Sequence, residues 1–501
     1  MTAGQGAGHA LMMFSIILST TLYTLDSTIA AVALPHMQGT FSAAQDQVAW
    51  VLTSYIVSSA IMTPMAGYLS DRLGRRRLFL FTVAGFIGTS MACGMAVNLE
   101  EMVLFRVLQG MFGAPLIPLS QATILDAYTP ATYGRGMALF GVGVMLGPIV
   151  GPTLGGWLTE FLNWRWVFFV NLPLGLIALT GLAVSVKDHP DEDRGRPFDL
   201  AGFAYLAISI GSLQLMLDRG NTLGWFESVE IRLEALMAAL AFYMFVVQLL
   251  TRDRPFIDPA IFRDRNFSFS MLVSFVIGFN LLATMAILPP LMQNLLGYPV
   301  LTTGWILAPR GVGTMLSMAI VGRLVERMDA RLLIVAGLGC MAFSLWQMAQ
   351  FDRNVTSALL ISTGVLQGFG MGLMFVPLSS MAFATLEAKY RPDGSGLYSL
   401  SRNIGSSVGI SVVMGALAAY YRAGREILVQ HINPFDLLHL EAARLPLPRP
   451  DQGSGLAMLD GMVQREALML GYLDAFQLMM VITIAAMPLI FLLRPVRPAA
   501  A

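Results

Sequence analysis

Fourteen segments of this chain are apolar and long enough to cross a lipid bilayer, and this feature limits the folds it can adopt. A spanning helix needs about 20 apolar residues. Backbone groups in the bilayer core must be satisfied within the protein, so such segments fold as helices. We therefore expect an all-α integral membrane protein with fourteen transmembrane helices, at about 12–34, 48–70, 78–97, 101–124, 136–159, 166–186, 199–217, 232–250, 268–292, 303–322, 332–350, 356–381, 397–421 and 469–493.

The composition excludes several classes of protein. Hydrophobic residues make up 56% of the chain and charged residues only 12%, about half the charged fraction of soluble proteins. That ratio excludes an ordinary cytoplasmic enzyme. The chain carries 31 basic and 31 acidic residues, so it lacks the basic field that nucleic-acid binding requires. We expect the lipid bilayer, and no nucleic acid, as its surroundings.

The basic residues of the loops predict how the chain lies across the membrane. With the N-terminus in the cytoplasm, the inside loops and the C-terminal tail hold nineteen lysines and arginines, whereas the short outside loops hold four. Cytoplasmic loops carry an excess of these residues, and long outside segments such as 422–468 cross largely regardless of charge. We therefore expect both termini to be cytoplasmic.

Two sequence patterns occur twice in the same order. Residues 67–76 and 322–331 both read G-x-L-x-[D/E]-R-x-x-x-R, and V-L-Q-G followed by P-L-S occurs from 107 and again from 365. The copies lie 255 to 259 residues apart. Parallel repeats of six spans are a design of secondary transporters. We expect an N-terminal six-helix bundle (1–186), two additional helices with linkers (187–262) and a C-terminal six-helix bundle (263–501) with a long periplasmic loop at about 422–468.

The motifs that supply chemical energy or catalysis are missing from the sequence. A P-loop needs a Gly-Lys pair, and neither Lys187 nor Lys389 follows a glycine. Residues 405–409 fit G-x-S-x-G, but they lie in an apolar helix and not at a strand–turn–helix junction, which favours helix packing. We expect a secondary transporter, not an enzyme, with no metal and no cofactor, driven by the proton gradient.

Asp26 is the candidate proton carrier, because it is the acidic residue most central to a predicted span. An ionisable group within the membrane is costly, and such groups usually serve a function. Burial favours the neutral form of a carboxyl and a nearby arginine favours the charged form, so a site of this kind can load and release protons. A structural aspartate at a helix contact, or one that lines a polar cavity, is the alternative.

Arg106 is the second candidate for proton coupling, and it lies within the fourth predicted span. Its counterpart in the second repeat is Gly364, so the repeat does not require an arginine there. A buried cation needs a partner, which a carboxylate or helix carbonyls could supply, in a coupling role or as a structural anchor. Arg310 and Arg402 are weaker candidates, for which snorkelling or backbone capping is an equal interpretation.

Two further groups are candidates for a conformational switch. The fifth predicted span carries glycines at four-residue spacing, which places a bare stripe on one helix face, and two prolines that bend the helix: Gly143, Gly147, Gly151 and Gly155, with Pro148 and Pro152. Ordinary close packing is the alternative. The loop after the second span holds a cluster of glycines and charged residues: Gly67, Asp71, Arg72, Gly74 and Arg75. One interpretation is a latch between helices that forms in one state of the transporter. The alternative is that the charges only reflect the cytoplasmic position of the loop.

These motifs together resemble the major facilitator superfamily, and within it the fourteen-span drug:proton antiporter family, in particular its EmrB-type permeases. The resemblance rests on the loop motif at 67–77, the span-four motif at 104–113, the span-five motif G-x-x-x-G-P-x-x-G-P-x-x-G-G at 143–156 and the first-span signature at 25–35. The first-span signature departs at Ala31, where the family usually has asparagine.

The resemblance implies a pump of the bacterial inner membrane that exports hydrophobic or amphipathic drugs in exchange for protons. It also implies a periplasmic membrane-fusion adaptor and an outer-membrane channel as partners, in a tripartite efflux system of the kind that confers antibiotic resistance. A dedicated exporter of one metabolite, such as a fatty acid, siderophore or antibiotic, is the alternative. The sequence assigns no residue to substrate contact.

Overall fold

The computed structural model describes residues 3–129, 132–186, 198–325, 327–430 and 453–495, and every regular element of these residues is a helix. The N-terminal part of the chain forms nine helices in the described residues: α1 (Ala3–Phe41), α2 (Gln45–Met62), α3 (Met65–Leu73), α4 (Arg75–Met95), α5 (Leu99–Gly113), α6 (Leu116–Ala127), α7 (Tyr133–Phe161), α8 (Trp166–Phe169) and α9 (Asn171–Ser185).

The middle and C-terminal parts add long helices joined by short ones. The middle part comprises α10 (Leu200–Leu223), η1 (Trp225–Glu227), α11 (Val229–Thr251) and η2 (Pro259–Arg263). The C-terminal part comprises α12 (Arg265–Pro290), η3 (Leu291–Leu295), α13 (Val300–Leu324), α14 (Ala330–Met348), α15 (Ser357–Ala384), η4 (Ala388–Tyr390), α16 (Arg391–Gln430) and α18 (Gly453–Phe491).

These helices confirm the all-α membrane fold. Within the described residues, thirteen helical segments are long and apolar enough to cross a membrane, and the bent pair α2–α3 makes fourteen. Two of the predicted spans are interrupted where a proline follows the end of a helix. Pro64 begins α3 with a 60° bend after α2, and Pro115 precedes α6. Proline removes a backbone donor, so a helix bends or restarts there.

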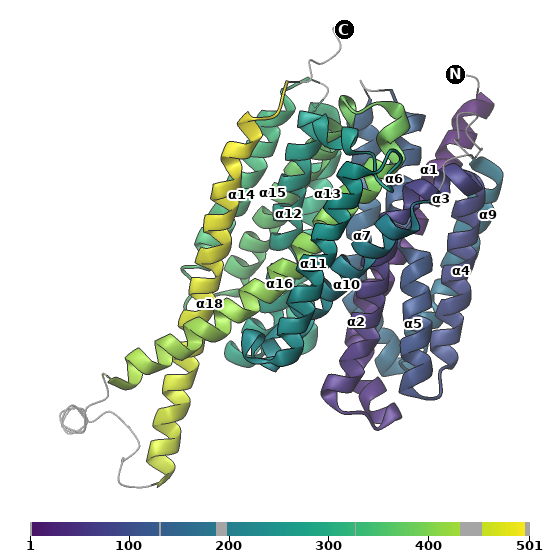
Figure 1. The fold of residues 1–501 in the computed structure, drawn as a ribbon. Helices are drawn as coiled ribbons and strands as arrows, with labels where there is room; N and C mark the ends of the chain where they lie inside the picture. The colour runs from purple at the N-terminus through teal and green to yellow at the C-terminus, as the bar shows by residue number, and fades with distance from the viewer. Residues whose placement is uncertain (1–2, 130–131, 187–197, 326, 431–452, 496–501) are drawn as a thin grey trace.

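Figure 1 shows α1 to α9 gathered on one side of the molecule and α12 to α18 on the other, with α10 and α11 beside their junction. Both chain termini lie at the same end of the bundle, which we call the terminal end; the opposite one is the far end (Figure 1). The α11 helix is the least covered of the spans, with 17% of its apolar window buried. Its exposed leucines and aromatic residues therefore suit contact with lipid.

The two repeats keep the same close helix contact. In the first, Gly110 of α5 lies against the backbone of Tyr55 and the side chain of Ser58 in α2. In the second, Gly368 of α15 lies against the backbone of Arg310 and the side chain of Thr314 in α13. A small residue lets two helix backbones approach closely in a membrane. The contact also identifies Arg310 as the positional counterpart of Tyr55.

The expected long loop at about 422–468 is helical in its described parts. The α16 helix continues to Gln430 and α18 begins at Gly453, so both run beyond the bundle at the far end (Figure 1). Residues 431–452 lie outside the described part of the chain. The prediction ends the spans where hydropathy falls, but loss of apolar residues limits burial in lipid and does not by itself end a helix.

Candidate functional site

Asp26 lies at the centre of the N-terminal bundle and forms an ion pair with Arg106. The two side chains come from α1 and α5, and neither is exposed to solvent. The distance from Arg106 Nη1 to Asp26 Oδ2 is 2.6 Å. A buried charge is costly unless it is paired and hydrogen-bonded. The two residues that the sequence singled out are therefore brought together, and each supplies the partner that the other needs.

Two amides complete the coordination of the Asp26 carboxylate. Gln109 Nε2 and Asn171 Nδ2 both donate to Asp26 Oδ1, each over 2.9 Å. Gln109 also accepts from Arg106 Nη1 through Oε1 at 2.8 Å, and Arg106 Nε donates to the carbonyl oxygen of Val51 at 2.9 Å. Both carboxylate oxygens of Asp26 thus receive hydrogen-bond donors, as a buried carboxylate requires.

Aromatic and small polar groups close the site around the pair. The Tyr55 ring lies 4.1 Å from Arg106 Cζ and the Phe168 ring 5.8 Å from it, which adds cation–π attraction. Ser90 Oγ lies 2.9 Å from Asn171 Nδ2 and accepts its second proton. In the described residues, Arg106 Nη2 and Asn171 Oδ1 have no hydrogen-bond partner. The donor Arg106 Nη2 and the acceptor Asn171 Oδ1 can therefore each form a hydrogen bond with a further group.

Sequence reasoning missed Gln109, Asn171 and Tyr55 as members of this site. Two of them stand within recognisable sequence patterns. Gln109 belongs to the repeated V-L-Q-G pattern, and Asn171 follows the aromatic run at 164–170. Gln109 and Asn171 join the site through hydrogen bonds to Asp26, which lies 83 and 145 residues away from them in the chain. A local sequence pattern does not predict contacts over such separations.

The glycine stripe of α7 packs against α1, the helix that carries Asp26. A β-carbon at Gly147 would overlap Thr24 Oγ1 and Leu25 N, immediately before Asp26. Gly143 and Gly151 make similar close contacts with Ile17 and with the Thr28 side chain. The stripe therefore faces a helix of its own bundle, whereas other residues of α7 contact α13.

The prolines of α7 do not end it. The helix runs from Tyr133 to Phe161 through Pro148 and Pro152. Thr28 Oγ1 donates to the Gly147 carbonyl oxygen at 3.2 Å, and Thr21 Oγ1 to that of Gly143 at 3.0 Å. These bonds supply donors from α1 to the α7 backbone close to where proline removes one.

The charged cluster after α2 lies at the terminal end, and its glycines have different roles. Gly74 joins α3 to α4 with a φ of 87°, a left-handed conformation that favours glycine. Gly67 lies directly against α16 of the C-terminal bundle, because a β-carbon there would overlap Asp393 Oδ1 and come within 2.8 Å of Asp393 N. Gly67 therefore allows the two bundles to touch.

Beside this contact, two ion pairs that share Asp126 connect the two bundles. Arg75 Nη1 lies 2.5 Å from Asp126 Oδ2 at the end of α6, and Arg391 Nη1 of α16 lies 3.3 Å from Asp126 Oδ1. Arg72 is exposed and donates to the Tyr68 hydroxyl of its own helix at 2.6 Å, and Asp71 is half-buried. Arg75, rather than Arg72, thus provides the link through Asp126 to the other half.

Comparison with known proteins agrees with this architecture. A family model described as Major Facilitator Superfamily matches residues 16–409. The chain belongs to the major facilitator superfamily. It is therefore a multi-pass membrane protein and a secondary transporter rather than an enzyme. The match spans the N-terminal bundle, the two additional helices and most of the C-terminal bundle.

Several curated relatives of this transporter match over most of its length. It is 32% identical to the fatty acid resistance protein FarB of Neisseria gonorrhoeae over 493 residues, which cover 98% of this chain and 97% of that protein. It is 33% identical to the multidrug export protein EmrB of Escherichia coli K12 over 433 residues, covering 86% of this chain and 85% of that one.

Solved structures share the fold at low sequence identity. The human organic anion transporter MFSD10 aligns with a TM-score of 0.64 and 13% identity, over 96% of this chain and 99% of that one. The proton:xylose symporter XylE aligns with a TM-score of 0.62 and 13% identity, over 95% of each chain. At this identity the likeness establishes the fold of the transporter and nothing further.

The two halves of the transporter differ at the position of the ion pair, although they are related by the repeat. At the offset of 258 residues that relates Gln109 to Gln367, Asp26 corresponds to Thr284 and Arg106 to Gly364. Gln367 Nε2 donates to Thr284 Oγ1 at 3.1 Å, as Gln109 donates to Asp26. The second half thus keeps the glutamine contact without any charge, so the fold itself does not require the ion pair.

Arg310 and Arg402 are both buried in the C-terminal bundle, with 9% and 7% of their surface exposed. In the described residues neither guanidinium forms an ion pair or a hydrogen bond to a helix carbonyl, so the structure does not support backbone capping for either arginine. Gln121 is buried and Tyr23 is half-buried, with the Tyr23 hydroxyl 2.7 Å from Ser59 Oγ.

Proposed function

We propose that this transporter is a proton-coupled antiporter that exports hydrophobic or amphipathic compounds across the bacterial inner membrane. The observation that carries the proposal is the buried Asp26–Arg106 pair, because a carboxylate sealed from water in the membrane is a group that a proton can load. The relatives named for multidrug export and fatty acid resistance support export as the direction of transport.

Protonation of Asp26 couples the proton to movement of α1 relative to α5. The charged carboxylate binds Arg106 and accepts from two amides; the neutral acid loses the attraction to Arg106 and gains a proton that it must donate. The close contact of Gly147 with Leu25 transmits a shift of α1 to α7, which also touches the second half through Gly141 and Met318. Proton entry and exit therefore alternate with rearrangement of the junction between the halves.

The terminal end is the cytoplasmic side in this proposal, as the excess of basic residues in its loops predicts. Contacts between the halves gather there. Asp126 pairs with Arg391, Ser395 Oγ donates to the Pro118 carbonyl oxygen at 3.1 Å, and Gly67 abuts Asp393. The arrangement described is then the one closed toward the cytoplasm. In this proposal a proton enters from the far side once the site opens toward that side, loads Asp26 and drives the return.

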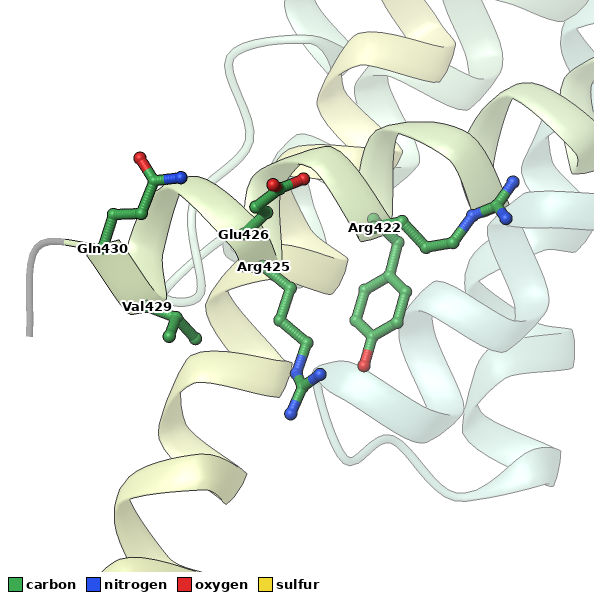
Figure 2. A pocket seen from close by; sticks show the side chains of 6 residues that line it. Arg422, Arg425, Glu426, Val429 and Gln430 are labelled. Carbon is green, nitrogen blue, oxygen red and sulfur yellow. The ribbon is translucent and has the colours of Figure 1, made fainter.

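The helical extension at the far end is the proposed docking surface for a periplasmic membrane-fusion adaptor, itself joined to an outer-membrane channel. The α16 helix has 40 residues, about 60 Å, which is about twice the thickness of the bilayer core. Arg425 of α16 pairs with Asp460 of α18 at 2.9 Å, so the two extensions lie side by side. A recess of about 440 Å³ lies on α16, where Figure 2 shows Arg422, Arg425, Glu426, Val429 and Gln430 around it.

Charge placed on this extension should prevent adaptor binding. Val429 and Met458 are large apolar residues with 49% and 57% of their surface exposed, and a glutamate at either position opposes burial in an interface. We expect Val429→Glu with Met458→Glu to abolish co-purification of a co-expressed membrane-fusion adaptor. The matched control is Phe226→Glu, an exposed apolar residue of η1 away from the extension. Retained co-purification with the double variant contradicts this part of the proposal.

A dedicated exporter of a single fatty-acid-like compound is the second candidate. One observation favours it. The match to the fatty acid resistance protein covers 98% of this chain, whereas the match to the multidrug export protein covers 86%. Both candidates use the same proton site and differ only in the range of compounds carried.

Transport in sealed everted vesicles tests the proposed function. With an acidic interior, wild-type protein should accumulate a hydrophobic dye against its gradient, and an ionophore that collapses the pH difference should stop accumulation. Moving one charge through 100 mV supplies about 2.3 kcal/mol, enough for a gradient of about fifty-fold. Accumulation that survives the ionophore refutes proton coupling. If a broad dye panel is not transported but a fatty acid is, the dedicated exporter is the better description.

A further inference from the structure

Arg310 is a buried cation without a counter-charge. It projects from α13, where its β-carbon lies 3.7 Å from the position that a β-carbon of Gly364 would take. Only 9% of the residue is exposed, and its Nη2 atom has no hydrogen-bond partner among the described residues. The next residue, Gly311, lies against Ile149 of α7, so this part of α13 faces the N-terminal half.

Arg402 of α16 is the second such cation, and it also lies at the junction of the halves. Its guanidinium stacks over the Phe375 ring at 5.6 Å, and Phe375 itself stacks on Phe140 of α7 at 6.3 Å. The hydroxyl groups of Tyr23 in α1 and Tyr398 in α16 are close enough to interact electrostatically with the Arg402 guanidinium. In the described part of the chain, no carboxylate pairs with Arg402.

The contrast with Arg106 shows what these two arginines lack. Arg106 is equally buried, but it has a carboxylate, an amide oxygen and a backbone carbonyl as acceptors. A buried arginine left without acceptors loses its hydration with no compensation, a cost of several kcal/mol. Gln367 Oε1, on the α15 segment that packs on Arg310, is likewise buried without a donor in the described residues. The second half therefore holds a buried donor without an acceptor, Arg310 Nη2, which an anionic ligand can satisfy.

We propose that Arg310 binds the anionic head group of the exported compound, that the positive charge of Arg402 attracts it from further along α15, and that the substrates therefore include amphiphiles with a carboxylate. This inference rests on the proposed export function and adds the substrate class. A carboxylate supplies the charge and acceptors that both guanidinium groups lack. Phe375 lies beneath the Arg402 guanidinium, and Ile149 of α7 lies against Gly311, the residue that follows Arg310, so apolar side chains near both arginines suit the hydrocarbon part of such a molecule. A cationic amphiphile would instead be repelled by two unpaired positive charges.

Equilibrium binding with ligands of one chain length and different charge tests this inference. The purified full-length transporter in nanodiscs is titrated with laurate, dodecanol and dodecyltrimethylammonium, with lipid-only nanodiscs as the background. We expect laurate to bind at least about ten-fold more tightly than dodecanol, and the cation more weakly than either, because a hydrogen bond to a charged group contributes enough for that factor. Equal binding of laurate and dodecanol to the wild type overturns the proposal.

Two variants assign the effect to the arginines. Arg310→Gln and Arg402→Gln should each weaken laurate binding by about ten-fold and change dodecanol binding by less than about two-fold. Arg310→Lys and Arg402→Lys retain the positive charge and should recover part of the laurate affinity. Arg232→Gln, at an exposed arginine of α11, is the matched control and should change neither. A loss that is equal for laurate and dodecanol overturns the assignment.

The binding measurement needs no gradient, so it separates this inference from the proposed function. Charge-selective binding without coupled transport would leave the head-group site in place and refute the antiport. Coupled transport of neutral dyes without charge-selective binding would refute only the head-group site. If either glutamine variant does not fold, the comparison of the three ligands on wild-type protein still decides the question.

Discussion

Arg106→Leu is expected to destabilise the folded transporter by about 3–5 kcal/mol, the usual effect of removing one partner of a buried ion pair. The variant leaves the Asp26 carboxylate buried with two amide donors and no cation. It also leaves the Val51 carbonyl oxygen without the Arg106 Nε donor. Thermal unfolding in detergent should therefore show a large fall in the midpoint temperature.

The second partner provides the control for this result. Adding Asp26→Asn to Arg106→Leu removes the uncompensated charge and should recover part of the stability, in a double-mutant cycle with a large coupling energy. Arg353→Leu breaks an exposed pair with Glu466 and should cost about 1 kcal/mol or less. If Arg106→Leu is no more destabilising than Arg353→Leu, the buried pair does not have the energetic weight assigned to it.

Gly67→Val is expected to reduce transport by about ten-fold or more. Any side chain at this position meets the Asp393 backbone and carboxylate, so α3 and α16 have to part. Overpacking of this kind costs about 1–3 kcal/mol, which lowers the population of the arrangement closed at the terminal end by roughly five- to 150-fold. Dye accumulation in everted vesicles measures the loss of activity.

A labelling experiment locates the effect of Gly67→Val. Ser395 is 1% exposed at the same contact, so Ser395→Cys should react slowly with a membrane-impermeant maleimide in otherwise wild-type protein. Adding Gly67→Val should speed the reaction. The control is Gly88→Val in α4, where a β-carbon would have no other atom within 4 Å, and it should leave transport and labelling unchanged. Unchanged labelling with Gly67→Val would show that Gly67 does not keep this end closed.

The fold follows from the sequence because span length and hydropathy are local properties. Each of the fourteen predicted segments matches one helix or one pair of broken helices of the structure to within a few residues, and the breaks before α3 and α6 come at prolines. The predicted loop at 422–468 is instead helical in its described parts, 422–430 and 453–468. Hydropathy predicts which residues enter lipid, but α16 and α18 continue as helices beyond the predicted spans, where Arg425 and Asp460 pair.

The candidate site follows from the sequence only in part. The apolar surroundings of Asp26 and Arg106 mark them as unusual, yet the sequence leaves open whether a carboxylate or carbonyls satisfy Arg106. The structure has both, Asp26 and the Val51 carbonyl oxygen. Gln109 and Asn171 are polar residues like many others until the packing of α5 and α9 on α1 brings them to the carboxylate. Likewise, only the placement of Asp126 distinguishes Arg75 from Arg72.

Substrate-driven proton movement through Asp26 tests the central claim most directly. In proteoliposomes that contain a pH-sensitive fluorophore, an imposed gradient of exported compound should drive an opposite proton flux with wild-type protein and with Glu160→Gln, at an exposed acid of α7. Asp26→Asn should let the compound move down its gradient without any proton flux. If Asp26→Asn carries the same proton flux per molecule transported as wild type, Asp26 does not carry the proton.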